Sequence, residues 1–108
     1  MTLSLHKAIS NYFVAVNAHD AEAVAQAFTV DGVVHDEGRT HRGRAEIHAW
    51  ANETIRKYHM ALIPLGVSGG DRSAAVNTKV SGTFPGSPIE LTFDFEIGDG
   101  GIRSLKIG

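Results

Sequence analysis

The chain has 108 residues, of which 43% are hydrophobic and 20% are charged, so it can form one soluble domain with one core but not two. Its formal net charge of -2 gives no electrostatic reason to bind nucleic acid or an anionic membrane, and no apolar run approaches the roughly 20 residues of a membrane span. The absence of cysteine excludes disulfides, thiolate metal sites and a cysteine nucleophile.

The first half of the chain shows the apolar spacing of helices. One stripe predicts a helix over about residues 3–18, and Asp20 is placed to cap a second, short helix. A turn is expected at Asp31-Gly32 and a loop over residues 38–43. A third helix is predicted from Ala45 to Tyr58.

From residue 58 onward the apolar period changes to two, which is typical of strands. The first strand contains Pro64, a residue expected at an edge, at a bulge or at the start of a strand, and a turn is expected over Ser68–Asp71. Residues 76–84 alternate, and the clearest alternation follows over residues 89–97. It predicts that Ile89, Leu91, Phe93 and Phe95 face the interior together with Val76, Val80 and Phe84. A hairpin turn at Gly98–Gly101 precedes a last strand with imperfect alternation, where a bulge is expected. Helices followed by strands favour a single α+β domain over residues 1–108, with helices on one face of an antiparallel sheet.

The short run Val33–Glu37 contains the most informative acidic residue. Alternation along a strand sends Val34 and Asp36 to the same face, and Val34 belongs with the core. Asp36 is therefore expected to point inward, where a carboxylate is costly unless it is paired, hydrogen-bonded or protonated. Such a group is a candidate general base. The alternative is a solvated carboxylate at the end of a strand.

Other motifs give little support to further chemistry. The loose cluster His35, His41 and His48 lacks the paired spacing of a zinc-binding helix. The glycine-rich turns are not followed by Lys-Ser or Lys-Thr, so they do not form a phosphate loop. We therefore expect neither a metal nor a cofactor.

Several segments resemble the nuclear-transport-factor-2-like superfamily, and within it the SnoaL-like proteins and ketosteroid isomerase. The resemblance covers essentially the whole chain and is specific for the fold. It is carried by Tyr12–Asp20, by Phe28, by Asp31–Asp36, by Arg42–Ile47, by Phe84–Pro88 and by the hairpin over residues 95–107. It implies a cone-shaped, curved antiparallel sheet packed with three N-terminal helices around an apolar pocket.

The resemblance also implies roles for individual residues. Tyr12 falls where ketosteroid isomerase has its oxyanion-hole tyrosine, and Asp36 falls where it has the carboxylate that shuttles the proton. The second oxyanion-hole acid of that enzyme is missing, because Phe93 stands in its place and Asp94 lies on the opposite face. The Asp–Arg–Asp arrangement of a limonene-epoxide-hydrolase-like site is not found on the late strands. For the pocket wall we expect Phe13, Val34, Trp50, Phe84 and Phe93.

Two hypotheses follow for the function. The chain is either an isomerase- or cyclase-like enzyme that moves a proton on a small apolar carbonyl compound, or a non-catalytic ligand-binding or dimerisation module. A homodimer formed through the outer face of the sheet is expected, with contributions from Asn77, Lys79, Thr83 and Thr92. The N-terminal residues do not resemble a secretory signal, so a cytoplasmic location is expected, with no nucleic acid or membrane as a partner.

Overall fold

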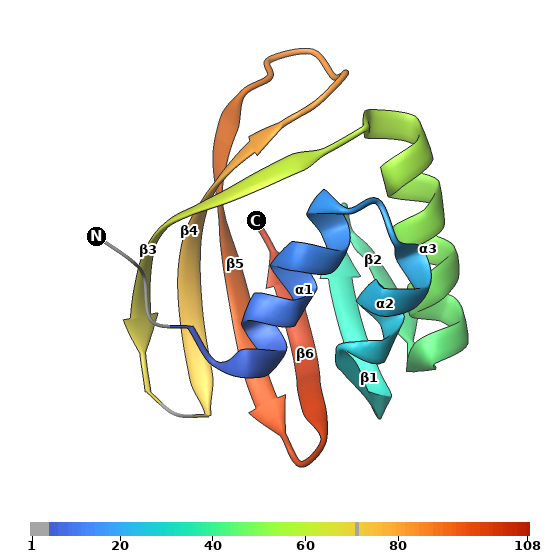
Figure 1. Cartoon of the computed structure of the whole chain (residues 1–108), viewed down its shortest axis with the longest axis vertical. Coiled ribbons are helices and arrows are strands. Elements are labelled where there is room, and N and C mark those ends of the chain that lie inside the picture. The colour runs from blue at the N-terminus through green and yellow to red at the C-terminus, as the bar shows by residue number, and fades with distance from the viewer. Residues whose placement is uncertain (1–4, 71) are drawn as a thin grey trace.

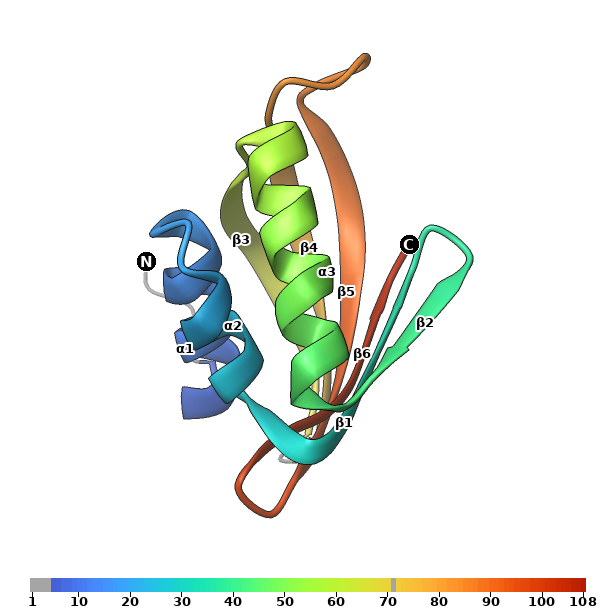
Figure 2. The same ribbon diagram turned by 90° about the vertical axis from the view of Figure 1, so that its right-hand side faces the viewer.

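A curved, unclosed sheet carries three helices on its concave face (Figures 1 and 2). This computed structural model describes residues 5–70 and 72–108, so residues 3 and 4 of the first predicted helix and Asp71 of the predicted turn lie outside the described residues. The helices are α1 (Lys7–Asn17), α2 (Ala21–Gln26) and α3 (Gly43–Tyr58). The strands are β1 (Phe28–Asp36), β2 (Arg39–Arg42), β3 (Ala61–Gly69), β4 (Ser73–Ser81), β5 (Ile89–Gly98) and β6 (Gly101–Ile107). No helix in this described part of the chain combines the length and the apolar character needed to cross a bilayer.

The sheet is mixed, which corrects the prediction of a purely antiparallel sheet. Its strand order is β2-β1-β6-β5-β4-β3, and β1 runs parallel to β6 with Val34 opposite Leu105. The other neighbouring strands are antiparallel. Alternation within a strand indicates which side chains face inward but not the direction of a distant partner, so this pairing has no local signal.

The predicted register of the late strands is confirmed. Phe93 and Phe95 are buried in β5, as are Val76 and Val80 in the neighbouring β4, whereas Asp94 is exposed on the outer face. Leu91 and Phe84 are partly buried against the same core, and Ile89, at the start of β5, remains 38% exposed. A slip of one residue would have exchanged these two faces.

Several predicted boundaries differ from the structure. Asp31-Gly32 is an irregularity inside β1 rather than a turn, because Gly32 lets the chain pass so close to Phe28 that a Cβ there would lie 2.9 Å from the Phe28 Cβ. Most of the predicted loop after β1 is the strand β2. The predicted bulges are confirmed near Pro64 in β3 and opposite Glu96 and Ile97 in β6.

Asn17 fastens the end of α1 to the edge strand β3. Its side-chain amide donates to the Leu62 carbonyl oxygen at 2.9 Å, and its side-chain oxygen accepts from the Leu62 backbone N–H at 2.7 Å. These two hydrogen bonds to the backbone of one residue orient the helix that carries Tyr12.

Replacing Asn17 by alanine should lower the free energy of unfolding by about 1–3 kcal/mol, because it leaves partly buried backbone groups of Leu62 without a partner. Urea denaturation of the parent and the variant measures this change. Asn11→Ala is the matched control, since Asn11 is exposed on the same helix. Equal losses in the two variants would contradict a fastening role for Asn17.

Candidate functional site

A cavity of about 170 Å³ lies between α3 and the inner face of the sheet. Tyr12 of α1, Asp36 of β1 and Trp50 of α3 contribute to its wall. Much of the rest is apolar and consists of Val80, Phe84, Ile89, Leu91, Phe93 and Ile107. The cavity therefore places one tyrosine hydroxyl and one carboxylate against an otherwise largely apolar surface.

Asp36 points inward from the last position of β1, as the alternation predicts. The indole N–H of Trp50 donates to its Oδ2 at 3.1 Å, which fixes the orientation of the carboxylate. Burial raises the pKa of Asp36, and the nearby charge of Glu37 raises it further. The Trp50 hydrogen bond, the proximity of His41 and the backbone N–H of Glu37 act in the opposite direction. The net effect is a raised pKa, which suits a general base that works near neutral pH.

Tyr12 is 1% exposed, and its ring packs edge-on against Phe13, Phe28 and Phe95. Among the described residues, no group hydrogen-bonds to the Tyr12 hydroxyl, and this hydroxyl is not sealed in the core, so it is reachable from the cavity. Burial, and secondarily the charge of Asp36, raises the pKa of this hydroxyl. It therefore stays protonated near neutral pH and can donate a hydrogen bond to a ligand.

The turn between β1 and β2 places a second carboxylate at the cavity. Asp36 pairs with Arg39, so the turn has two central residues, Glu37 and Gly38, with φ of 53° and 75°. Positive φ at both positions is the pattern of a tight hairpin turn that favours Asn, Asp or Gly. Glu37 lines the cavity, and its Oε1 accepts from the Tyr58 hydroxyl at 3.2 Å.

The structure brings together some of the predicted pocket residues and not others. Trp50, Phe84 and Phe93 lie on the cavity wall. Phe13 and Val34 are buried in the core and do not contribute to that wall. The prediction also missed Glu37 and Tyr58. The acidic pair at the end of β1 was a signal for Glu37, but its position depends on a hairpin that was read as a loop.

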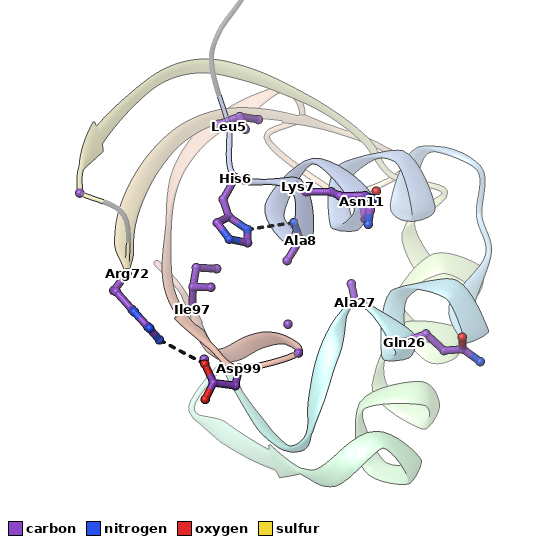
Figure 3. Close-up of a pocket in the computed structure, with 14 residues that line it drawn as sticks. Leu5, His6, Lys7, Ala8, Asn11, Gln26, Ala27, Arg72, Ile97 and Asp99 are labelled. Atoms are coloured by element: carbon purple, nitrogen blue, oxygen red, sulfur yellow. Dashed lines mark hydrogen bonds and ion pairs between the residues drawn. The ribbon is translucent and has the colours of Figure 1, made fainter.

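A wider hollow, of about 820 Å³, lies where the start of α1 faces the turn between β5 and β6 (Figure 3). Its charged residues, such as Lys7 and Arg72, are exposed, and Arg72 pairs with Asp99 at 3.7 Å. His6 caps α1 by accepting the backbone N–H of Ala8 (Figure 3). This hollow holds no buried ionisable group, so the Tyr12–Asp36 cavity is the better candidate for chemistry.

No group of three His, Asp or Glu side chains suited to a metal ion occurs in residues 5–70 and 72–108. His35 instead lies on the exposed side of β1, where its Nδ1 is 3.2 Å from the Thr40 hydroxyl. His41 stacks obliquely near Trp50, with ring centroids 6.0 Å apart. Arg44, at the start of α3, holds the Phe28 carbonyl oxygen through two N–H groups and so fixes that helix to β1.

The comparison with known families agrees with this architecture. The model of the SnoaL-like domain matches residues 9–104. The chain belongs to the SnoaL-like domain family. No curated protein matches it.

Several solved structures are similar to this SnoaL-like domain over nearly its whole length. A proposed polyketide cyclase from Sinorhizobium meliloti is 38% identical, with 96% of this chain and 95% of that chain covered and a TM-score of 0.91. The epoxide hydrolase/cyclase-like enzyme SalBIII of pyran ring formation in salinomycin is 23% identical, with 94% and 86% covered and a TM-score of 0.80. A protein with a ketosteroid isomerase-like fold from Catenulispora acidiphila, solved with trimethylamine, is 16% identical, with 97% and 86% covered and a TM-score of 0.85. The last two share the fold.

The raised pKa of Asp36 predicts how the free energy of unfolding depends on pH. The folded state favours the protonated form of Asp36 over the ionised form. The stability that the protonated carboxyl contributes is fully present below the unfolded pKa of about 3.9, and it is lost as the pH rises through the higher folded pKa. Asp36→Asn should therefore have a higher free energy of unfolding than the parent at pH 7, and this gain should fade towards acid pH. Urea denaturation at both pH values measures it. Asp94→Asn, on the outer face, is the control, and the same pH-dependent gain in both variants would contradict the assignment.

Proposed function

We propose that the cavity binds a small carbonyl compound and that Asp36 moves a proton on it, which is the first step of an isomerisation or a ring closure. One observation carries this proposal: a hydrogen-bonded carboxylate with a raised pKa and a reachable tyrosine hydroxyl share one cavity with a largely apolar wall. Either group alone has an ordinary structural explanation, but their convergence in one cavity favours a site.

The reaction would run through an enolate. The ionised carboxylate of Asp36 takes a proton from the carbon next to the carbonyl, while the Tyr12 hydroxyl donates a hydrogen bond to the oxygen on which negative charge develops. In an isomerisation, Asp36 returns the proton to another carbon of the same molecule. In a ring closure, the enolate carbon attacks a second carbonyl carbon, and that carbonyl's oxygen takes the proton.

The size of the cavity limits the ligand. An engineered protein cavity of about 150 Å³ holds one benzene molecule, whereas pockets for drug-sized ligands measure about 300–1,000 Å³. At about 170 Å³, the cavity suits a body the size of one substituted ring rather than the four fused rings of a steroid. The resemblance to ketosteroid isomerase therefore supports the type of chemistry and not the substrate.

The similarity to the Sinorhizobium meliloti protein supports a cyclase-like role, because it extends over nearly the whole of both chains. A specific observation favours the alternative of a binding module without catalysis. Phe93 lies on the wall, and the resemblance aligns it with the second acid of ketosteroid isomerase, so Tyr12 is the one oxyanion donor that this resemblance assigns. A weaker oxyanion site lowers the rate, and the experiment has to detect slow proton transfer.

Proton exchange tests the proposed function directly. Small one-ring ketones with an exchangeable hydrogen next to the carbonyl are incubated with the protein in deuterated water, and deuterium uptake is followed by NMR. The parent should accelerate the exchange of at least one of them, and Asp36→Asn should abolish the acceleration. Asp94→Asn is the control on the outer face of the sheet. If no ketone in the set exchanges faster with the parent than with Asp36→Asn, the proposed proton transfer by Asp36 is refuted.

Binding of a planar phenol tests the same geometry without turnover, because a phenol imitates the enolate. Tyr12→Phe should weaken phenol binding by about 1–3 kcal/mol, since it removes one partner of a buried hydrogen bond. Asp36→Asn should bind phenol at least as tightly as the parent, because the neutral amide imitates the protonated acid. Calorimetry on the three proteins measures both effects. Equal affinities of the parent and Tyr12→Phe would limit the resemblance to ketosteroid isomerase to the fold.

The oligomeric state is a separate proposal. Asn77, Lys79 and Thr92 are exposed on the outer face of the sheet, and Ile63, opposite Lys79, is 51% exposed there. Thr83 lies in the loop after β4 and binds the Tyr58 carbonyl oxygen, so it does not belong to this face. A homodimer through this face should sediment with twice the chain mass at micromolar concentration, and Ile63→Arg should shift it towards the monomer. A monomeric parent would contradict the proposal.

A further inference from the structure

The charged side chains on the cavity wall are all carboxylates. Its wall contains the carboxylates of Asp36 and Glu37 and no lysine, arginine or histidine. The cationic side chains near these carboxylates lie outside the wall. Lys57 has its Nζ 5.1 Å from the centroid of the Tyr58 ring, and Arg39 and Lys106 border a neighbouring hollow that Asp36 and Glu37 also line. An acidic site with low-dielectric walls attracts a cation more strongly than a neutral molecule of the same shape.

The same wall is rich in aromatic rings. Trp50, Tyr58 and Phe84 border the cavity near the two carboxylates, and the Tyr58 and Phe84 rings meet edge-on with centroids 5.8 Å apart. Aromatic faces attract cations, and ammonium groups bearing alkyl substituents also gain from apolar contact. The Nζ of Lys57 lies 5.1 Å from the centroid of the Tyr58 ring, so this ring already accepts one ammonium group.

Glu37 occupies a costly backbone position. Its φ of 53° lies in the left-handed region, where a residue without a special local hydrogen bond is disfavoured. The other two non-glycine residues with positive φ in the described part of the chain are His19 and His59, and histidine is enriched in that region. A strained residue whose side chain reaches a cavity points to a role in that cavity.

From these three features we infer that the cavity takes a ligand with an ammonium group, which lies beside Glu37 and the rings of Tyr58 and Trp50 while the rest of the ligand points towards Tyr12. The inference rests on the proposed function only in using the same cavity. It narrows the proposed small carbonyl compounds to those that also carry a protonated or quaternary ammonium group. Glu37 is then a specificity-determining residue, and its hydrogen bond with Tyr58 orients it when no ligand is bound.

A pair of probes that differ in charge and not in shape tests this inference. Choline carries a quaternary nitrogen, and neohexanol is the alcohol in which a carbon atom replaces that nitrogen. NMR titration of the full chain at neutral pH should show at least tenfold tighter binding of choline than of neohexanol, with shifts at the Trp50 indole N–H. Equal affinity for the two, or no saturable binding of choline, would overturn the inference.

Two charge-matched variants locate the effect. Glu37→Gln keeps an oxygen that can accept from Tyr58 and removes only the charge, so it should lose choline affinity at least fivefold and keep its affinity for neohexanol. Glu22→Gln removes the same charge from an exposed position on α2 and should leave both affinities unchanged. If the two variants lose the same amount of affinity for choline, the attraction comes from the net charge of the protein and Glu37 has no specific role.

The result is separable from the proton-transfer test. Ketone exchange that depends on Asp36, together with equal binding of choline and neohexanol, would remove the ammonium inference and leave the proposed function in place. Charge-selective binding without any ketone exchange would leave a binding module for small amines. The two experiments therefore fail independently.

Discussion

The inward-facing carboxylate of Asp36 is the constraint on which the site depends. Removing part of a carboxylate from water is costly unless neighbouring groups hydrogen-bond to it, and for the half-buried Asp36 the Trp50 indole supplies such a bond from α3. The bond joins the last residue of β1 to the middle of α3, and Arg44 joins the first residue of β1, Phe28, to the start of the same helix. The helix is therefore held to β1 at both ends of that strand.

The packing of the aromatic residues explains why the cavity is small. Tyr12, Phe13, Phe93 and Phe95 contact one another with ring centroids between 5.5 and 6.4 Å apart. This cluster packs between α1 and the sheet, and the cavity lies on its α3 side, next to the β1–β2 turn. Tyr12 is the one member of the cluster with a polar atom, so the boundary between core and cavity runs along its ring.

The fold was predictable where local periodicity carries the information. Asp36 was placed correctly because Val34 shares its face of the strand and belongs to the core. The parallel contact between β1 and β6 was not predictable, because it joins distant segments whose alternation is the same in either direction. Phe13 and Val34 show a further limit: alternation and helical spacing identify buried residues but do not separate a core position from a cavity wall.

The positions of Glu37 and Tyr58 at the cavity could not be predicted from the sequence. Glu37 directly follows β1 and Tyr58 is the last residue of α3, and they meet because the β1–β2 turn lies next to the last turn of that helix. A glutamate before glycine is a weak turn signal, since glutamate does not favour the left-handed backbone that this turn imposes. The residue that fits the local rules least well is thus the one that brings a second negative charge to the cavity. Local preference and burial together explain the fold, whereas the chemistry of the site depends on a position where local preference is overridden.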